Sequence, residues 1–203
     1  MKVALCVLSY KRYDLTAKTV AHNIANCHHE NIGLFVEDTF GIAKASNNVI
    51  RRAYLEGYDL FVMMGNDIIM PDGWLKGYVE NTNVLSGMIS YPVGEIRNHI
   101  SYEMVIGCFA ISRRVIDRVG AFDERFDPYG AIDLDYNKRC TEKGFMNFYL
   151  PLKSSRHISE NDGSLYGFNK AELVDKTWGL HSEGETLGHI PIIEMEQWAN
   201  TNI

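Results

Sequence analysis

The sequence predicts an α/β protein in which a mixed, mostly parallel sheet is flanked by helices. Three apolar runs, at residues 3–8, 32–36 and 60–64, alternate with two segments of helical periodicity. Continuous apolar runs are typical of parallel strands that are covered on both faces. Strands that alternate with helices predict a parallel, doubly wound arrangement. Because one hydrophobic core commonly serves a chain of 203 residues, we expect a single domain.

The segment after the first apolar run has the pattern of an amphipathic helix. Ala17, Val20, Ala21 and Ile24 recur at the spacing of one helical face, so we expect this face to be buried. Asp14 precedes them and is expected to cap the helix, because its carboxylate can accept a backbone N–H of the first turn.

A second helix is predicted over residues 42–54. Ala45, Val49 and Ala53 lie on one face of it, and Gly57 follows where the periodic pattern stops. The apolar run at 60–64 is therefore expected to be the third strand.

This third run stops abruptly at Gly65, Asn66 and Asp67. An Asn-Asp pair after a strand is ordinarily a turn with local side-chain hydrogen bonds. It also stands at the carboxyl end of a strand, where ligands of open α/β sheets collect, so both interpretations stay open on this stretch alone. Asp72 is expected to cap the next helix, at residues 74–79.

The second half of the sequence is less regular, and a long polar loop interrupts its strands. Long loops between strands often carry function. The expected elements are a strand in the run 84–89, an irregular loop at 90–103, a strand at 105–111, a short helix closed by Gly120, a helix that opens within 130–139 and ends at Gly144, and a strand at 146–150.

Polar side chains follow each of the first three predicted strands, and the carboxyl ends of parallel strands meet at one edge of a sheet. A crevice at this edge is a place for a nucleotide, with the acidic turn holding a metal ion on the phosphates. The sequence contains neither a Gly-x-Gly-x-x-Gly loop nor a Gly-Lys-Ser/Thr loop, which argues against a dinucleotide oxidoreductase and a P-loop NTPase. The crevice residues are Ser9, Tyr10, Arg12, Glu37, Asp38, Asn66 and Asp67.

The composition favours a small-molecule partner. The net charge of −6 argues against general binding to nucleic acid or to an anionic membrane. No apolar run approaches the roughly 18 residues of a membrane span, and no cleavage signal follows the N-terminal residues. We therefore expect a soluble, cytoplasmic protein.

Residues 107–139 carry the motifs by which the chain resembles a known family. A strand at Gly107, the turn Gly-Ala-Phe-Asp-Glu-Arg-Phe at 120–126, and a helix with Asp133, Asp135 and Arg139 follow one another. This order and spacing resemble the glycine strand, the "GxFDE.F" turn and the "EDxDxxxR" helix of the inverting family 2 glycosyltransferases. A rhamnosyltransferase-like branch is one alternative within that family.

The resemblance extends upstream and covers residues 3–164. Residues 7–12 resemble the family's first nucleotide-binding strand. Residues 41–47 resemble its "G.a.arN" helix, and Asn47 is the asparagine with which this motif ends. Residues 66–75 fall where the family has its metal-binding motif.

This resemblance implies a GT-A-type, Rossmann-like domain that transfers a sugar from a nucleoside-diphosphate sugar to an acceptor hydroxyl with inversion. It implies Asp133 as general base, and Asp67 with His157 as ligands of Mn²⁺ or Mg²⁺. A UDP-sugar is the favoured donor, and the acceptor is a glycan or another hydroxyl compound. Asp135 and Arg139 are expected to position their helix. The nucleotide-binding residues implied are Ser9, Tyr10, Arg12, Glu37, Asp38, Asn47 and Asn66.

The same resemblance divides the single domain, 1–203, by function. Residues 1–80 are expected to bind the nucleotide, and residues 81–168 to hold the acceptor and the catalytic base. The tail, 169–203, lies beyond the resemblance, and it contributes Trp178 and His181 as candidate acceptor contacts.

Three departures from the family pattern bear on these expectations. The metal motif supplies one carboxylate, Asp67, where the family often supplies two. Ile132 stands where a glutamate usually precedes the base, and Thr39 with Phe40 replaces a serine and an aspartate. Two alternatives therefore stand beside the enzyme: a non-catalytic module that binds sugar nucleotides or glycans, and a sugar-nucleotide pyrophosphorylase. The latter needs a glycine-rich loop after the first strand, which this sequence lacks.

Overall fold

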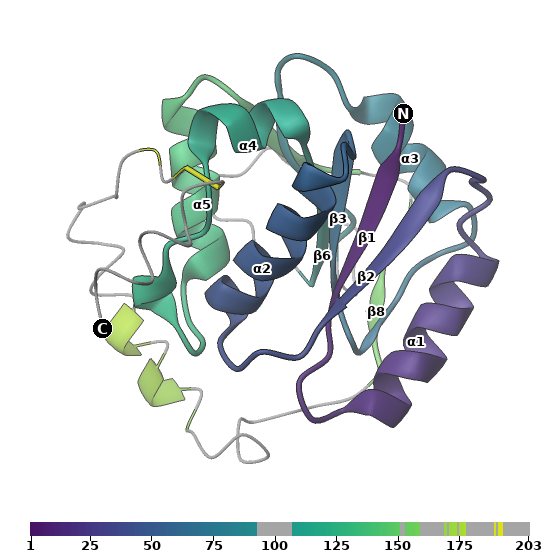
Figure 1. Cartoon of the computed structure of the whole chain (residues 1–203), viewed down its shortest axis with the longest axis horizontal. Helices are drawn as coiled ribbons and strands as arrows, with labels where there is room; N and C mark the ends of the chain where they lie inside the picture. The colour runs from purple at the N-terminus through teal and green to yellow at the C-terminus, as the bar shows by residue number, and fades with distance from the viewer. Residues whose placement is uncertain are drawn as a thin grey trace.

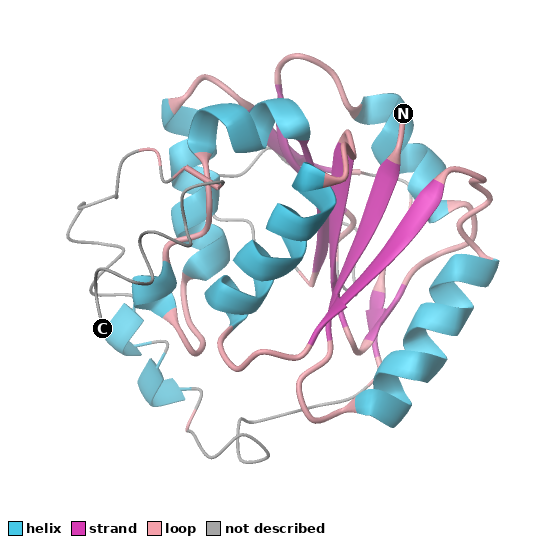
Figure 2. Ribbon diagram, viewed as in Figure 1, coloured by secondary structure: helices cyan, strands magenta, loops and turns pink. Residues whose placement is uncertain are grey.

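The computed structural model describes residues 1–92, 107–150, 153–158, 169, 171–173, 175–177, 189 and 191–192. In this part of the chain, a six-stranded sheet lies between layers of helices (Figure 1, Figure 2). The strands of this sheet, in spatial order, are β2 (Ile32–Glu37), β1 (Val3–Leu8), β3 (Leu60–Gly65), β6 (Cys108–Ser112), β5 (Ser86–Ser90) and β7 (Met146–Tyr149). A separate two-stranded sheet consists of β4 (Ile68–Ile69) and β8 (Arg156–His157).

The large sheet is mixed and mostly parallel, as predicted. Strand β1 runs parallel to both β2 and β3, and β5 runs parallel to β7. Strand β6 is antiparallel to its neighbours β3 and β5. The clearest boundary differences lie in the second half of the sheet: β5 begins at Ser86 after the exposed Val84 and Leu85, Ser90 belongs to β5 rather than to the loop, and β6 begins at Cys108. Most of the predicted loop, and the predicted start of β6, lie outside the described residues.

Two hydrophobic clusters, one on each face of the sheet, make up the core. Alternate residues of β1 enter opposite clusters: Ala4 and Cys6 enter one, whereas Leu5 and Val7 enter the other. Both faces are therefore covered, which explains why the strand sequences are continuously apolar. Helices α2 (Ile42–Leu55), α4 (Arg113–Val119) and α5 (Ile132–Glu142) pack on the first face, and α1 (Tyr13–Ala25) and α3 (Trp74–Asn81) on the second (Figure 1).

Helix α2 buries the face that its periodicity predicts, with Ala45, Val49 and Ala53 in the interior. Gly57 follows the helix with a φ of +78°, a conformation that glycine adopts without steric cost. None of the described helices combines the length and the apolar character that a membrane span needs.

Helix α1 departs from its prediction in two ways. Asp14 is exposed within the first turn and does not cap the helix, because the cap position is taken by Arg12, whose side chain makes no capping bond. Ala17 and Ala21 are also exposed. The residues that α1 buries are instead polar, namely Thr16, Thr19 and Asn23.

Asn23 explains why the buried face of α1 is polar. Its side-chain amide donates to the carbonyl of Ile68 at 2.8 Å and accepts from the N–H of Met70 at 2.9 Å. Its backbone carbonyl accepts from the indole N–H of Trp74 at 2.9 Å. Strand β4, the two-residue strand that follows Asp67, pairs with β8. Asn23 thus supplies additional hydrogen bonds to β4 and to the residue after it.

Helix α3 also begins differently from the prediction. Its cap residue is Gly73, which has a left-handed conformation with φ +64°, and no side chain caps the helix. Asp72 instead points to the surface, where one of its carboxylate oxygens lies 2.7 Å from Nε2 of His28. Asp72 stands one residue before the cap position of α3, and the left-handed Gly73 occupies that position.

We predict that Asn23→Ala lowers the free energy of unfolding by about 2–4 kcal/mol. The substitution leaves the carbonyl of Ile68 and the N–H of Met70 buried without partners, and each such group costs about 1–3 kcal/mol. Urea denaturation followed by circular dichroism measures the loss.

Asn26→Ala on the same helix is the matched control. Asn26 is partly exposed and its amide bonds only the carbonyl of His22 within the helix, at 2.8 Å, so the expected loss is below about 1 kcal/mol. Equal losses in the two variants would show that Asn23 does not anchor β4.

Candidate functional site

The carboxyl ends of β1 and β3 meet through Ser9 and Asn66. Both residues are buried. The amide of Asn66 donates to the carbonyl of Ser9 at 3.3 Å, and the Ser9 hydroxyl lies 2.9 Å from that of Thr16 on α1. The structure therefore brings together two of the residues predicted to line the nucleotide crevice.

Asp67 and Arg12 form an ion pair at this same edge. Their closest atoms, Oδ2 of Asp67 and Nη1 of Arg12, are 3.4 Å apart, and both side chains are largely shielded from solvent. Arg12 ends the β1–α1 connection, and Asp67 follows β3, so parallel pairing of β1 with β3 is what places the two charges side by side.

The remaining crevice residues lie at the end of β2 and in the loop after β1. Asp38 accepts a hydrogen bond from the phenol of Tyr13 at 3.1 Å, and this bond raises the pKa of Tyr13 above its ordinary value. Glu37 pairs with Arg52 of α2 at 3.3 Å. Tyr10 packs its ring against Phe40, with 5.3 Å between the ring centroids. The carboxylates of Asp38 and Glu37 therefore each bond another side chain of the protein, Tyr13 and Arg52 respectively.

His157 lies next to the acidic turn. It pairs opposite Ile68 in the β4–β8 sheet, and the N–H of Ile158 donates to the carbonyl of Asp67 at 2.9 Å. A Cβ on Gly107 would lie 2.9 Å from Nε2 of the His157 ring, so the imidazole rests against the backbone of Gly107. The proximity of Asp67 and His157, which the sequence predicted only through the family resemblance, is thus a feature of the structure.

Asp67 and His157 are a carboxylate and an imidazole on adjacent segments. Within the described ranges, no three His, Cys, Asp or Glu side chains gather closely enough to hold a metal ion by themselves. Magnesium-type sites commonly use one or two protein carboxylates and complete their shells with substrate phosphates and water. The two residues fit a metal ion that is bound together with a diphosphate, and they do not form a closed protein site.

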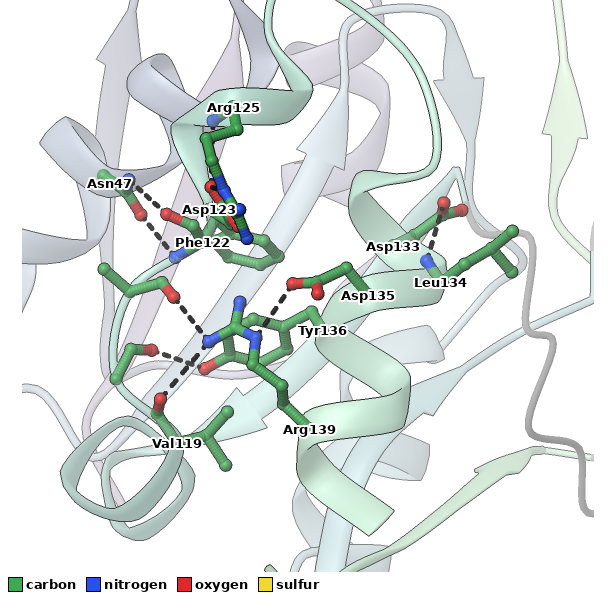
Figure 3. A network of polar contacts seen from close by, with 12 residues as sticks. Asn47, Val119, Phe122, Asp123, Arg125, Asp133, Leu134, Asp135, Tyr136 and Arg139 are labelled. Atoms are coloured by element: carbon green, nitrogen blue, oxygen red, sulfur yellow. Dashed lines mark hydrogen bonds and ion pairs between the residues drawn. The ribbon is translucent and has the colours of Figure 1, made fainter. Parts of the chain in front are cut away.

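Asp133 and Asp135, both in the first turn of α5, project from opposite sides of the helix (Figure 3). Asp135 is buried and pairs with Nε of Arg139 at 2.8 Å, which agrees with its expected positioning role. Asp133 is only partly buried, and its Oδ1 accepts the N–H of Leu134 at 3.0 Å. Asp133 is therefore the acid of this turn that a substrate can reach.

Tyr129 connects this acid with the acidic turn, and the sequence analysis did not single it out. Burial raises the pKa of the Tyr129 phenol, and the negative charges of Asp133 and Asp67 raise it further. The Tyr129 phenol thus lies within electrostatic range of both carboxylates. An aromatic residue next to Gly130, just before a helix that starts with two acids, was the available signal.

Helix α5 holds the turn that follows α4, at residues 119–121. The guanidinium Nη1 of Arg139 donates to the carbonyls of Val119 and Ala121, at 3.3 Å and 2.9 Å. The Tyr136 hydroxyl donates to the carbonyl of Gly120 at 2.9 Å. Figure 3 shows these bonds converging on the turn from one side.

Asn47 holds the same turn from α2 (Figure 3). Its amide accepts from the N–H of Phe122 at 2.8 Å, and it donates to the Phe122 carbonyl and to Glu124, each at 3.0 Å. The side chain is fully buried. These contacts make Asn47 a positioning residue here, and its contact with a nucleotide stays a prediction.

Asp127 forms a further link that the sequence did not reveal. Its carboxylate accepts the N–H groups of Ala43 and Lys44, at 2.7 Å and 3.0 Å, at the N-terminus of α2. Burial raises the pKa of this carboxyl to about 6, while the two N–H groups oppose the shift. The loop that bears Tyr129 is therefore tied to α2 at its first residue.

No protein-family model and no curated protein matches this sequence. Solved structures do match the fold. The catalytic domain of Drosophila β1,4-galactosyltransferase 7, in complex with xylobiose, superposes with a TM-score of 0.69 at 14% identity, over 94% of this chain and 82% of that one. A variant of that enzyme in complex with manganese, UDP-Gal and xylobiose gives a TM-score of 0.67 at 13% identity, over the same shares of the two chains, 94% and 82%.

Two other glycosyltransferases have the same fold. The mannosyltransferase PcManGT of Pyrobaculum calidifontis, with GDP-Man and Mn²⁺, gives a TM-score of 0.62 at 14% identity over 80% of this chain and 58% of that one. GalNAc-T7 with UDP, GalNAc and Mn²⁺ gives 0.66 at 11% identity, and this chain spans 48% of its length while 90% of this chain is covered. The chain thus has the GT-A fold of nucleotide-sugar glycosyltransferases, as predicted.

We predict that Asp127→Asn flattens the pH dependence of stability between pH 4 and pH 6. The folded-state pKa of about 6 lies above the ordinary 3.8, so the folded protein binds the proton more tightly than the unfolded chain. The parent therefore loses stability as pH rises through this window, whereas the variant has no carboxyl to ionise there.

Urea denaturation at several pH values measures the difference in unfolding free energy, variant minus parent. This difference should increase by on the order of 1 kcal/mol from pH 4 to pH 7, a figure discounted for the partial exposure of the carboxyl. A difference that stays level or decreases over this range would contradict the raised pKa of Asp127.

Proposed function

We propose that this protein is a metal-dependent glycosyltransferase that moves a sugar from a nucleoside-diphosphate sugar to an acceptor hydroxyl with inversion. The observation that carries the proposal is the arrangement at the carboxyl end of β3, where Asp67 lies 3.4 Å from Arg12 and next to the β8 segment that bears His157. The protein thus combines a strand-end acid suited to a metal, Asp67, with a partly exposed helix-start acid suited to a base, Asp133, in a fold shared with nucleotide-sugar glycosyltransferases.

The donor side of the site consists of Asp67 and His157, which would hold Mn²⁺ or Mg²⁺ on the diphosphate. When bound, the cation neutralises the charge that develops on the leaving nucleoside diphosphate. Three of the structural neighbours were solved with manganese, which supports Mn²⁺ as the cofactor. Arg12 stands beside Asp67 and is available to pair with phosphate oxygens once a cation takes the carboxylate.

On the acceptor side of the site, Asp133 acts as the general base. Its carboxylate takes the proton of the acceptor hydroxyl while that oxygen forms a bond to the anomeric carbon of the sugar. The bond from this carbon to the diphosphate oxygen breaks, and the electron pair leaves with the nucleoside diphosphate. Attack from the side opposite the leaving group inverts the anomeric configuration.

The nucleotide is assigned to the crevice between the ends of β1, β2 and β3. Its proposed contacts are Ser9, Tyr10, Arg12, Glu37, Asp38, Asn47 and Asn66. A UDP-sugar is the favoured donor, and neighbours with UDP-Gal and with UDP support this choice, although one neighbour holds GDP-Man. We also propose the division into a nucleotide-binding half, 1–80, and a catalytic half, 81–168, and membership of family 2.

A module that binds sugar nucleotides without turnover is the second candidate. The observation that favours it is the small number of metal ligands, one carboxylate and one imidazole in the described segments. Such a module would bind the nucleotide sugar and release no nucleoside diphosphate with any acceptor or with water.

We predict that Asp67→Asn abolishes the manganese-dependent thermal stabilisation by a nucleoside diphosphate. The amide cannot supply the negative charge that the cation needs. Mn²⁺ affinity in the presence of the nucleotide should decrease by more than about tenfold, since even changes beside metal ligands cost 10–100-fold. Electron paramagnetic resonance of free Mn²⁺ measures this affinity directly.

Asp72→Asn is the matched control, since Asp72 lies in the same β3–α3 connection but pairs with His28 at the surface. It should leave the manganese dependence intact. Unchanged nucleotide and metal affinity in Asp67→Asn would place the metal site elsewhere.

We predict that Asp133→Asn lowers kcat by roughly 10²- to 10⁴-fold and changes donor affinity little, because asparagine is nearly isosteric but cannot accept the proton. Donor affinity is measured by calorimetry, and kcat by release of the nucleoside diphosphate. Transfer near the parent rate would exclude Asp133 as the base.

Asp14→Asn is the control for this prediction, because Asp14 is an exposed acid in the first turn of α1. Its kcat should match that of the parent. Asp135→Asn does not serve, because Asp135 is buried against Arg139, and breaking a buried ion pair costs about 3–5 kcal/mol of stability.

A further inference from the structure

The C-terminal segment lies against the loop that leads into α5. The hydroxyl of Thr177 accepts the N–H of Ala131 at 3.2 Å and donates to the carbonyl of Leu173 at 2.8 Å. Thr177 is buried, whereas its neighbours Asp175 and Lys176 are exposed. The tail therefore directs one polar side chain into the catalytic half of the protein.

Gly130 shows how closely the tail approaches this loop. A Cβ on Gly130 would lie 2.0 Å from Oγ1 of Thr177 and 2.6 Å from its Cβ. Any larger residue at this position would push Thr177 away. The absence of a side chain on Gly130 is what lets Thr177 reach the next residue, Ala131.

Thr177 supplies a bond that α5 cannot make from its own sequence. Ala131 is the cap residue of α5, and its methyl group makes no capping bond. In a capping box, the side chain three positions into the helix accepts the N–H of the cap residue, but here that position is the apolar Leu134. The Thr177 hydroxyl takes this role from a distant part of the chain.

The bond matters for the site because Asp133 lies two residues beyond Ala131. The loop before α5 is tied at one end by Asp127 to the N-terminus of α2 and at the other end by Thr177. Between these two ties stands Tyr129, within electrostatic range of both Asp133 and Asp67. The orientation of the first turn of α5 thus depends on both ties.

We infer that Thr177 is a positioning residue for Asp133, and that the segment 175–177 of the tail thereby belongs to the transferase site. The inference rests on the proposed function, because it assigns the tail a role in that reaction. Thr177 fixes the N–H of Ala131, and through it the first turn of α5, so that the Asp133 carboxylate meets the acceptor hydroxyl.

Other described residues of the C-terminal segment also make contacts, both within the segment and with the core. The Asn169 side chain accepts the N–H of Ala171 at 3.0 Å and donates to Glu172 at 3.2 Å. Further along, Ile192 is buried in the cluster that includes α2, α4 and α5, and the His189 ring lies 3.1 Å from the carbonyl of Asp117.

The test compares Thr177→Val, which keeps the shape and removes the hydroxyl, with Thr177→Ser, which keeps the hydroxyl. In Thr177→Val, the amide of Ala131 should exchange with solvent about fivefold faster by ¹H–¹⁵N NMR, since a hydrogen bond of about 1 kcal/mol is lost. In the same variant kcat should decrease about tenfold with donor KM within twofold, because a misplaced base slows the chemical step. Thr177→Ser should restore both values.

Thr82→Val is the matched control. The Thr82 hydroxyl also donates to the carbonyl four residues earlier, that of Tyr78, at 2.7 Å, but it lies at the end of α3. This variant should leave the exchange of Ala131 and kcat unchanged.

The outcomes separate this inference from the proposed function. Equal exchange of Ala131 in the parent and in Thr177→Val, or faster exchange with an unchanged kcat, would overturn the positioning role while transfer by the parent stands. A parent protein that transfers no sugar from any donor would overturn the proposed function, and with it the catalytic part of this inference.

Discussion

The buried carbonyls at the end of α4 and of the two residues after it are the constraint on which the packing of α5 depends. A helix leaves its last four carbonyls without partners inside the helix, and each buried and unpaired group costs about 1–3 kcal/mol. Arg139 and Tyr136 donate to the carbonyls of residues 119–121. Because both donors belong to α5, the bonds that satisfy α4 also fix the helix that carries Asp133. Stability and site geometry therefore depend on the same contacts.

The bonds of Arg139 to residues 119 and 121 explain why the two acids of α5 differ in their surroundings. A guanidinium in the interior needs a counter-charge, and Asp135 supplies it from one helical turn away, at 2.8 Å. Asp133 points to the other side of the helix and remains partly exposed. Asn47 completes the arrangement from α2, since it holds Phe122 through both its N–H and its carbonyl. Helix α2 and the segment that leads to α5 are thus joined by buried polar bonds in addition to apolar packing.

Local patterns predicted the elements well and the polar interior poorly. The strands and the face of α2 follow from apolar runs and helical spacing, and both are found in the structure. The face of α1 was predicted only in part: Val20 and Ile24 pack against the core, whereas Ala17 and Ala21, which have the spacing of a buried stripe, are exposed. Asn23 is buried instead, since β4 needs its amide as a bonding partner. The capping roles predicted for Asp14 and Asp72 were also wrong, and other residues start both helices.

The sequence by itself determined the α/β class, the strands that end in polar residues, and, through the family motifs, the candidates Asp67, Asp133 and His157. These follow from properties that neighbouring residues share, namely apolar runs, helical spacing and motif order. Only the tertiary structure decided that Tyr129 lies within electrostatic range of two carboxylates and that Thr177 bonds the start of α5. The physical reason is that such contacts join segments far apart in the chain, and their partners are set by strand pairing and helix packing.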